Sequence, residues 1–333
     1  MAKVDCHVHS KYSEYVLLTY SMLQYIGAKD SYNELEDIYK TAKSRGMDYV
    51  AITDHDTIDG ALILNDKHPD VIVGEELEVK ASDEGHLVHV GVLGLDEKIH
   101  NDLKDLKKIG IKETTAYLKE RDIFYFLAHV SSSASKEPLS AGLIREWMNY
   151  VDTLEVINGM LTSQENLLSR TIADLYGKKV IAGSDAHSLD KIGKTFTIAE
   201  KANTKEGFMQ ALKKGEVHVT GELNYTTRWL TNESFKVIYQ TFQEVLLHPL
   251  QRQRHWTKKY CLDYLITLGS APPIATYLPV FLIAKNYHNK HIKRALKLQE
   301  EILEEHAENT RREELKKALI KRIKEYFEKY SKK

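Results

Sequence analysis

Five segments of the sequence place histidine or carboxylate side chains in or directly after a strand-like run of residues. They are DCHVH at 5–9, AITDHD at 51–56, VIVGEE at 71–76, FLAHV at 126–130 and VIAGSDAH at 180–187. In barrels and open α/β sheets, functional side chains gather at the carboxyl ends of the strands. The repetition therefore predicts an α/β fold whose strand ends bring these polar side chains together.

The region from Met1 to about Leu223 alternates strand-like and helix-like segments, as βα units do. The expected strands are 49–53, 71–73, 88–93, 124–128, 153–157 and 180–182. Helices are expected at about 113–121, 165–176 and 205–214. A further helix is expected between Ser31 and Gly46, because Ser31 with Glu34 matches a capping box and Gly46 lies where a C-terminal cap belongs.

Beyond Leu223 the sequence predicts helix almost to its end. Four apolar residues recur at every fourth position and indicate one helix face, which favours a helical bundle. They are Leu315, Leu319, Ile323 and Phe327. The uncharged stretch 264–284 is long enough to cross a bilayer, but its three prolines favour a buried helical hairpin or interface. We expect two domains, 1–223 with the site and 224–333 as a helical region for oligomerisation or partner binding.

The charge balance gives the chain no global attraction to nucleic acid or membrane. Lys and Arg number 47 against 48 Asp and Glu, so the formal net charge is -1, which excludes neither partner. The only cysteines, Cys6 and Cys261, lie in unrelated contexts and argue against a disulfide framework. The N-terminal residues contain no apolar signal-peptide core. We therefore expect a cytoplasmic protein without a clear transmembrane segment.

The residue types in the five segments point to metal chemistry. His7 and His9 are two residues apart, which places both imidazoles on the same side of an extended segment. Glu75 and Glu76 follow an apolar strand, where buried carboxylates call for a cation partner. Imidazoles and carboxylates without a cysteine set suit Zn, Mn or Fe. More than four ligands imply more than one ion, and such centres hydrolyse phosphate esters.

Taken in order, six motifs resemble the polymerase and histidinol phosphatase (PHP) family of metal-dependent phosphoesterases. These are DCHVHSKYS, AITDHDTIDG, GEELEV, HVGVLGL, LAHV and GSDAHS, and the similarity covers about residues 3–222. The resemblance implies a distorted (β/α)7 barrel with up to three divalent cations. It implies eight metal ligands: His7, His9, His55, Glu76, His89, His129, Asp185 and His187. Glu76 would bridge two ions, and His86 is left open as a substitute for His89.

One departure from the family pattern concerns the first motif. Where many members have Ser-Asp-Gly, this chain has Ser13-Glu14-Tyr15. Either Glu14 reaches a metal with its longer side chain or this ligand is missing. The sequence therefore does not decide whether two or three ions are bound. Asp54 is expected as a metal ligand or as a carboxylate that orients a ligand histidine.

The resemblance implies a hydrolase acting on phosphoric ester bonds. Asp185 or His187 would transfer the proton to the leaving group. The substrate would be a phosphorylated small molecule, a nucleotide or an oligonucleotide, with a possible homo-oligomer formed through the C-terminal helices. Two alternatives stay open: a regulatory or binding module without turnover, and hydrolysis at carbon of the amidohydrolase type.

Overall fold

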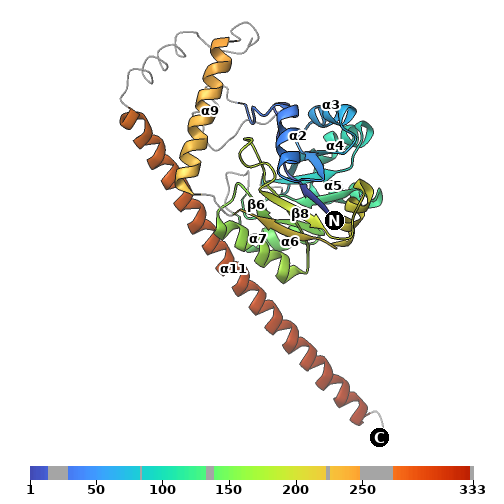
Figure 1. The fold of residues 1–333 in the computed structure, drawn as a ribbon. Coiled ribbons are helices and arrows are strands. Elements are labelled where there is room, and N and C mark those ends of the chain that lie inside the picture. Colours follow the sequence, from blue (N-terminus) through green and yellow to red (C-terminus); the bar gives the residue numbers. More distant parts are fainter. Residues whose placement is uncertain (14–28, 83–84, 133–138, 223–225, 248–272, 331–333) are drawn as a thin grey trace.

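A computed structural model describes residues 1–13, 29–82, 85–132, 139–222, 226–247 and 273–330 (Figure 1). Nine strands form one sheet in the order β7-β6-β5-β4-β3-β2-β1-β8-β9. They are β1 (Ala2–Asp5), β2 (Tyr49–Ile52), β3 (Val71–Lys80), β4 (Leu87–Leu93), β5 (Phe124–Leu127), β6 (Thr153–Asn158), β7 (Lys179–Gly183), β8 (Thr195–Ala199) and β9 (His218–Gly221). Strands β1 to β7 thus lie side by side in chain order, as the (β/α)7 prediction requires.

The sheet curls until its two ends meet. Beyond β1 and β7, Val8 pairs in parallel with Ala186, and the His9 N–H donates to the Ala186 carbonyl at 3.1 Å. The Thr197 hydroxyl of β8 donates to the Ala182 carbonyl of β7 and accepts from its N–H, both at 2.9 Å. These contacts close the sheet into a nearly complete barrel, which confirms the predicted fold.

The distortion of the barrel has two visible causes. Strand β4 runs antiparallel to both β3 and β5, whereas the other neighbours among β1 to β7 are parallel. Strands β8 and β9 form an antiparallel pair joined to β1, in addition to the seven strands that a (β/α)7 barrel has. Strand β3 also continues to Lys80, well past the predicted end at Val73, because it pairs with β4 from Gly74 to Lys80.

Helices cover the outside of the barrel and agree with most of the predicted ranges. They are α2 (Leu35–Ser44), α3 (Asp59–Lys67), α4 (Glu97–Ile109), α5 (Ile111–Glu120), α6 (Ala141–Trp147), α7 (Ser163–Tyr176) and α8 (Lys205–Lys214). The predicted capping box at Ser31 is wrong, since α2 begins four residues later and Glu34 makes no side-chain cap. The Ser31 hydroxyl donates instead to the His9 carbonyl at 3.0 Å. Gly46 has φ 82° and ends the helix as expected.

The C-terminal region is helical, as predicted, with α9 (Thr227–Leu247) and α11 (Pro273–Tyr330). Helix α11 packs on α7, and its residues Ala295, Leu298 and Ile302 belong to the same apolar cluster as Trp147 of α6. No helix in the described ranges is long and apolar enough to cross a membrane. Part of the stretch 264–284 lies outside those ranges.

The prolines of this stretch do not break the helix where the structure describes it. Pro273 is the first residue of α11, a position that needs no backbone N–H, and Pro279 lies within the continuous helix. The predicted helical hairpin is therefore not seen from Pro273 onwards. The side chains of the repeating apolar residues at 315–327 lie outside the described ones.

Polar and aromatic contacts also fasten the helical region to the barrel. The His291 ring donates from Nδ1 to Glu165 Oε1 at 2.7 Å, near the N-terminus of α7. On α9, the Trp229 ring covers the ammonium group of Lys191, with 4.1 Å from Nζ to the ring centre. Lys191 also donates to the Gly159 carbonyl at 3.0 Å, and burial lowers its pKa to about 8. The helical region thus lies directly against the loop that follows β7.

Candidate metal centre

One oxygen of Glu76 lies at the meeting point of three histidine rings. Glu76 Oε2 is 3.1 Å from His7 Nε2, 3.3 Å from His9 Nε2 and 3.3 Å from His55 Nε2. The carboxylate is only 1% exposed, and this oxygen has no hydrogen-bond partner among the described residues. The two imidazole nitrogens of His7 and His9 are themselves 3.1 Å apart. Lone-pair atoms that converge in this way require a positive charge between them.

The other oxygen of Glu76 faces a second pair of histidines. Glu76 Oε1 lies 3.1 Å from His89 Nδ1 and 3.0 Å from His129 Nε2. These two rings come from β4 and from the end of β5, where His129 adopts φ 29°. The carboxylate therefore stands between two groups of imidazoles, the arrangement that a bridging ligand would have.

A third group includes a carboxylate that the sequence analysis missed. Potential ligand atoms of His9, Asp30, His55 and His187 lie within 4.8 Å of one another. Asp30 is buried, and its Oδ1 lies 3.0 Å from His187 Nε2 while its Oδ2 lies 3.6 Å from His9 Nδ1. Oδ2 has no hydrogen-bond partner among the described residues. Glu14, which the sequence analysis considered as a further ligand, lies outside the described residues.

Asp185 joins the first and third groups. Its Oδ1 lies 3.2 Å from His9 Nε2 and 3.5 Å from His7 Nε2. The residue has φ 52°, a left-handed conformation that turns the chain sharply at the end of β7. His187 follows on the same loop, with its Nδ1 2.9 Å from the Asp185 carbonyl. All eight predicted ligand residues therefore lie in one cluster at the carboxyl ends of the parallel strands and on the adjoining strand β4.

The electrostatics of the cluster favour a positive charge. Burial alone lowers the pKa of His7 and His9, but the Glu76 and Asp185 carboxylates outweigh it and raise the pKa of both, that of His9 to about 10. Burial raises the pKa of Glu76 and of Asp185, yet the surrounding histidines hold each well below its ordinary value. For His55 burial dominates and lowers the pKa to about 3, which leaves a neutral imidazole. The cluster thus fits divalent cations, which prefer neutral imidazole and ionised carboxylate ligands.

Three further candidates of the sequence analysis have other partners. Asp54 accepts hydrogen bonds from the Ser10 N–H at 2.5 Å and the Ser10 hydroxyl at 2.6 Å, so it holds the residue after His9. His86 lies outside the three groups, and its Nδ1 is 2.9 Å from the Ser82 hydroxyl.

Glu75 points to the opposite face of β3 from Glu76. Its Oε2 is 2.7 Å from Nδ1 of His100 on α4. The alternation of side chains along a strand accounts for this division, since neighbouring residues face opposite sides of the sheet. Glu76, and not Glu75, is therefore the carboxylate in the cluster.

Glu155 is a second buried carboxylate that the sequence analysis did not select. It lies on β6 with 1% exposure, and its Oε1 is 3.0 Å from His7 Nδ1. The sequence does contain a feature that could have identified Glu155, because this charged residue interrupts the apolar run of a predicted strand. Asp30 had no such signal, because an acidic residue shortly before a helix is typical of an N-terminal cap.

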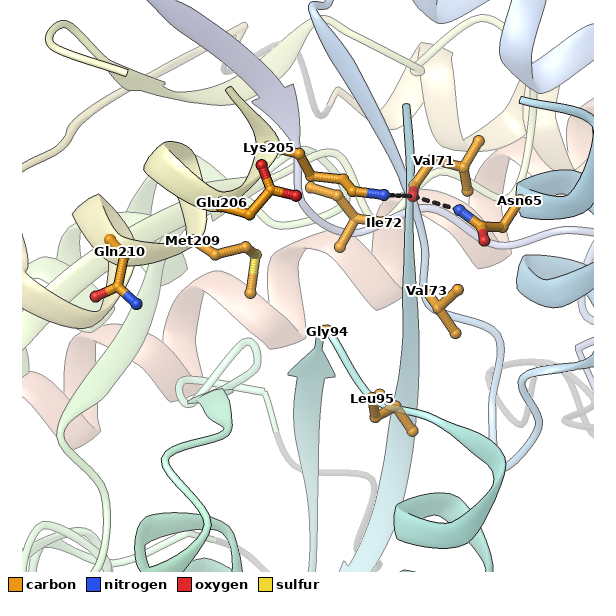
Figure 2. Close-up of a pocket in the computed structure, with 10 residues that line it drawn as sticks. All are labelled: Asn65, Val71, Ile72, Val73, Gly94, Leu95, Lys205, Glu206, Met209 and Gln210. Carbon is orange, nitrogen blue, oxygen red and sulfur yellow. Dashed lines mark hydrogen bonds between the residues drawn. The ribbon is translucent and has the colours of Figure 1, made fainter. Parts of the chain in front are cut away.

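The hollow in Figure 2 lies at the other end of the barrel. It is formed where β3 begins and β4 ends, against α8. The Val71 carbonyl accepts hydrogen bonds from Asn65 Nδ2 at 2.9 Å and from Lys205 Nζ at 3.2 Å (Figure 2). These donors are already paired, and the hollow contains none of the residues of the metal-centre cluster.

A barrel that brings six histidines together with acidic side chains fits the class of proteins that hold several metal ions. Comparison with known proteins identifies the family. A family model described as PHP-associated matches residues 163–217. An uncharacterised protein of Methanocaldococcus jannaschii is 30% identical over 138 residues, which are 40% of this chain and 71% of that protein. The chain belongs to the PHP family.

Solved structures were also compared with the chain. A candidate metal-dependent phosphoesterase of Bifidobacterium adolescentis is 16% identical, with a TM-score of 0.41 over 63% of this chain and 95% of that one. PsfC of Pseudomonas syringae is 15% identical, with a TM-score of 0.45 over 72% and 96%. An amidohydrolase of Chromobacterium violaceum is 15% identical, with a TM-score of 0.44 over 65% and 97%.

Proposed function

We propose that this protein is a hydrolase of phosphate esters that works with two or three divalent cations. The observation that carries the proposal is the Glu76 carboxylate, which stands between His7, His9 and His55 on one side and two further imidazoles on the other. A buried carboxylate shared between two sets of nitrogen atoms is suited to hold two ions close together. Paired ions of this kind serve phosphoryl transfer.

The three groups of side chains suggest how the cations would be held. His7 and His9 with Asp185 would hold one ion, and His89 with His129 a second. The third would be held by Asp30, His55 and His187, with Glu76 shared between the first two. The nitrogen-rich ligand set suits Mn, Fe or Zn. When bound, the cations would lower the pKa of water and neutralise the charge that develops on the phosphoryl oxygens.

The residues at the rim of the cluster are suited to the proton transfer. The side chains of Asp185 and His187 are 12% and 13% exposed, whereas those of His7 and His9 are completely buried. A group that gives a proton to a leaving alkoxide must reach the substrate, and these two residues are among the more exposed of the cluster, together with His129 at 13%. His187 Nε2 is 3.0 Å from Asp30, which orients its ring. We assign the proton transfer to Asp185 or His187.

The substrate class follows from the same chemistry. Cations and imidazoles recognise the phosphoryl group itself, so a phosphorylated small molecule or a nucleotide suits the site. The formal charge of -1 gives the whole chain no global attraction to a long nucleic acid, so it does not favour an oligonucleotide over these smaller substrates and does not exclude one. A homo-oligomer formed through the C-terminal helices remains part of the proposal.

Elemental analysis of protein purified without chelator and without a histidine tag tests the proposal first. We expect two to three equivalents of Mn, Fe or Zn per chain. Phosphate release from a panel of phosphomonoesters and nucleotides then follows, with Asp185→Asn and His9→Ala as variants. Both should lose more than about 100-fold in turnover, a typical cost for a proton-transfer or ligand group.

A matched control is His218→Ala, because this histidine is 70% exposed on β9 and outside the cluster. It should retain parental turnover, and circular dichroism should show that all variants are folded. No bound metal after incubation with these ions, or unchanged turnover in both site variants, would overturn the proposal. In the first case the binding-module alternative would replace it.

A further inference from the structure

Glu155 connects several parts of the cluster without being one of its predicted ligands. Its Oε1 accepts a hydrogen bond from His7 Nδ1 at 3.0 Å. Its Oε2 accepts from the His129 backbone N–H at 3.0 Å and from Asn158 Nδ2 at 2.8 Å. Three donors from three parts of the chain thus converge on one buried carboxylate.

Asn158 extends this connection to a third predicted ligand. Its Nδ2 also lies 3.1 Å from Asp185 Oδ2. The backbone of Asn158 is fixed by Asn166 of α7, whose Oδ1 accepts from the Asn158 N–H at 2.8 Å and whose Nδ2 donates to its carbonyl at 3.1 Å. Asn158 therefore has little freedom to turn away from Asp185.

The shape of β6 explains how both residues reach the barrel interior. Residues three apart on a regular strand face opposite sides of the sheet. Between Glu155 and Ile157 the pairing of β6 with β7 shifts register, the sign of a β-bulge. Val156 belongs to the outer apolar cluster and Ile157 packs against it, so two successive residues face outward. The irregularity brings Glu155 and Asn158 to the same inner side.

A glycine on the next strand leaves room for the contact between Glu155 and His7. A Cβ atom on Gly183 of β7 would lie 2.4 Å from His7 Cβ and 3.1 Å from Glu155 Oε1. Any larger residue at position 183 would push the imidazole away from the carboxylate. The packing of three strands is therefore matched to this hydrogen bond.

We propose that Glu155 and Asn158 are positioning residues that fix His7, His129 and Asp185 relative to one another before a cation binds. When a cation is bound, the neutral imidazole of His7 would keep its one N–H at Nδ1, next to Glu155, and the Nε2 lone pair would be directed into the cluster. The backbone bond to His129 fixes the turn at the end of β5. The amide of Asn158 holds the Asp185 oxygen that does not face His9. This inference rests on the proposed metal centre.

The test compares Glu155→Gln with Glu75→Gln in the full-length protein. A glutamine offers one oxygen and an amide group, so it cannot accept from all three donors that Glu155 serves. Glu75 is an equally buried carboxylate that faces away from the cluster. Co²⁺ is the probe, because its visible spectrum reports ligand geometry and its affinity can be measured against a chromophoric chelator.

Glu155→Gln should weaken Co²⁺ binding about 10- to 100-fold and change the visible spectrum of the bound ion, as loss of such outer partners does. Glu75→Gln should keep the parental affinity and spectrum. Parental affinity and spectrum in Glu155→Gln would refute the inference. A parent protein that binds no Co²⁺, Mn²⁺ or Zn²⁺ would instead refute the proposed function.

Asn158→Ser decides the question if Glu155→Gln does not fold. Serine is too short to reach both carboxylates, but it leaves the backbone contacts with Asn166 in place. We expect weaker Co²⁺ binding and a changed spectrum in this variant as well. Parental values for both properties would overturn the inference.

Discussion

Replacing Gly183 by alanine should destabilise the protein more than the size of one methyl group suggests. The added Cβ would lie 2.4 Å from His7 Cβ and 2.7 Å from the His7 backbone nitrogen. Neither atom belongs to the flexible end of a side chain. The segment that carries His7 is held on both sides, by the Ala186 pairing and by the Val8 N–H bond to Thr53 at 3.0 Å. Relief of the clash must therefore move a strand.

The expected cost follows from these contacts. Extra methyl groups in a packed core cost about 1–3 kcal/mol, and contacts with backbone belong to the upper part of that range. We expect Gly183→Ala to lower the free energy of unfolding by about 3 kcal/mol. The matched control is Gly142→Ala in α6, where the nearest atom is Ser140 Oγ at 4.0 Å. Alanine in a helix is favoured over glycine by about 0.5–1 kcal/mol, so this variant should be slightly stabilised.

Urea unfolding followed by circular dichroism in the presence of chelator measures both variants without a contribution from bound metal. The same substitution should change stability in opposite directions at the two positions. If Gly183→Ala unfolds at the parental urea concentration, β7 can move away from β1 at little cost, and the proposed tight positioning of His7 is incorrect.

Three other predictions concern the metal centre and the tail. Asp30→Asn should reduce the bound metal by about one equivalent in elemental analysis, and full metal content would exclude Asp30 as a ligand. Because the pKa of His7 and His9 is raised, protons compete with cations, so Zn²⁺ affinity should increase from pH 6 to pH 8 in chelator competition, and a flat profile would contradict this. His291→Ala removes the hydrogen-bond partner of Oε1 of buried Glu165 and should cost about 1–3 kcal/mol in urea unfolding at pH 7. Burial raises the pKa of Glu165, but the contact with His291 lowers it by more, so the folded-state pKa lies below its ordinary value. The contact therefore stabilises the fold at a pH above the unfolded-state pKa of Glu165, and the loss of stability in His291→Ala should disappear as acid protonates Glu165.

The sequence was sufficient to predict those features that depend on local pattern. His55, His129 and Asp185 each follow an apolar strand directly, so their meeting at one end of the barrel could be expected before any coordinates. The predicted ranges of the strands before these residues agree with the structure, because burial on both faces imposes continuous apolar runs on central strands.

Other features depend on tertiary contacts that leave no local signal. Asp30 reaches the cluster from a segment before α2, and nothing in its neighbours distinguishes a ligand from a helix cap. Ser31 matches a capping motif, but its hydroxyl donates to the His9 carbonyl because the barrel brings that oxygen close. The reversal of β4 and the bulge after Glu155 are set by pairing between strands, which single-strand periodicity does not report.

Helix α11 packs on the barrel, and its length also determines how far its C-terminal end lies from the barrel. Its last described contact with α7 places the His306 ring near Tyr176, and the helix then continues to Tyr330 (Figure 1). These roughly 24 residues span about 36 Å at 1.5 Å per residue. Any group carried at the far end is held at that reach from the barrel. Inserting one residue into this part of the helix would extend the reach by about 1.5 Å and rotate the far end by about 100°.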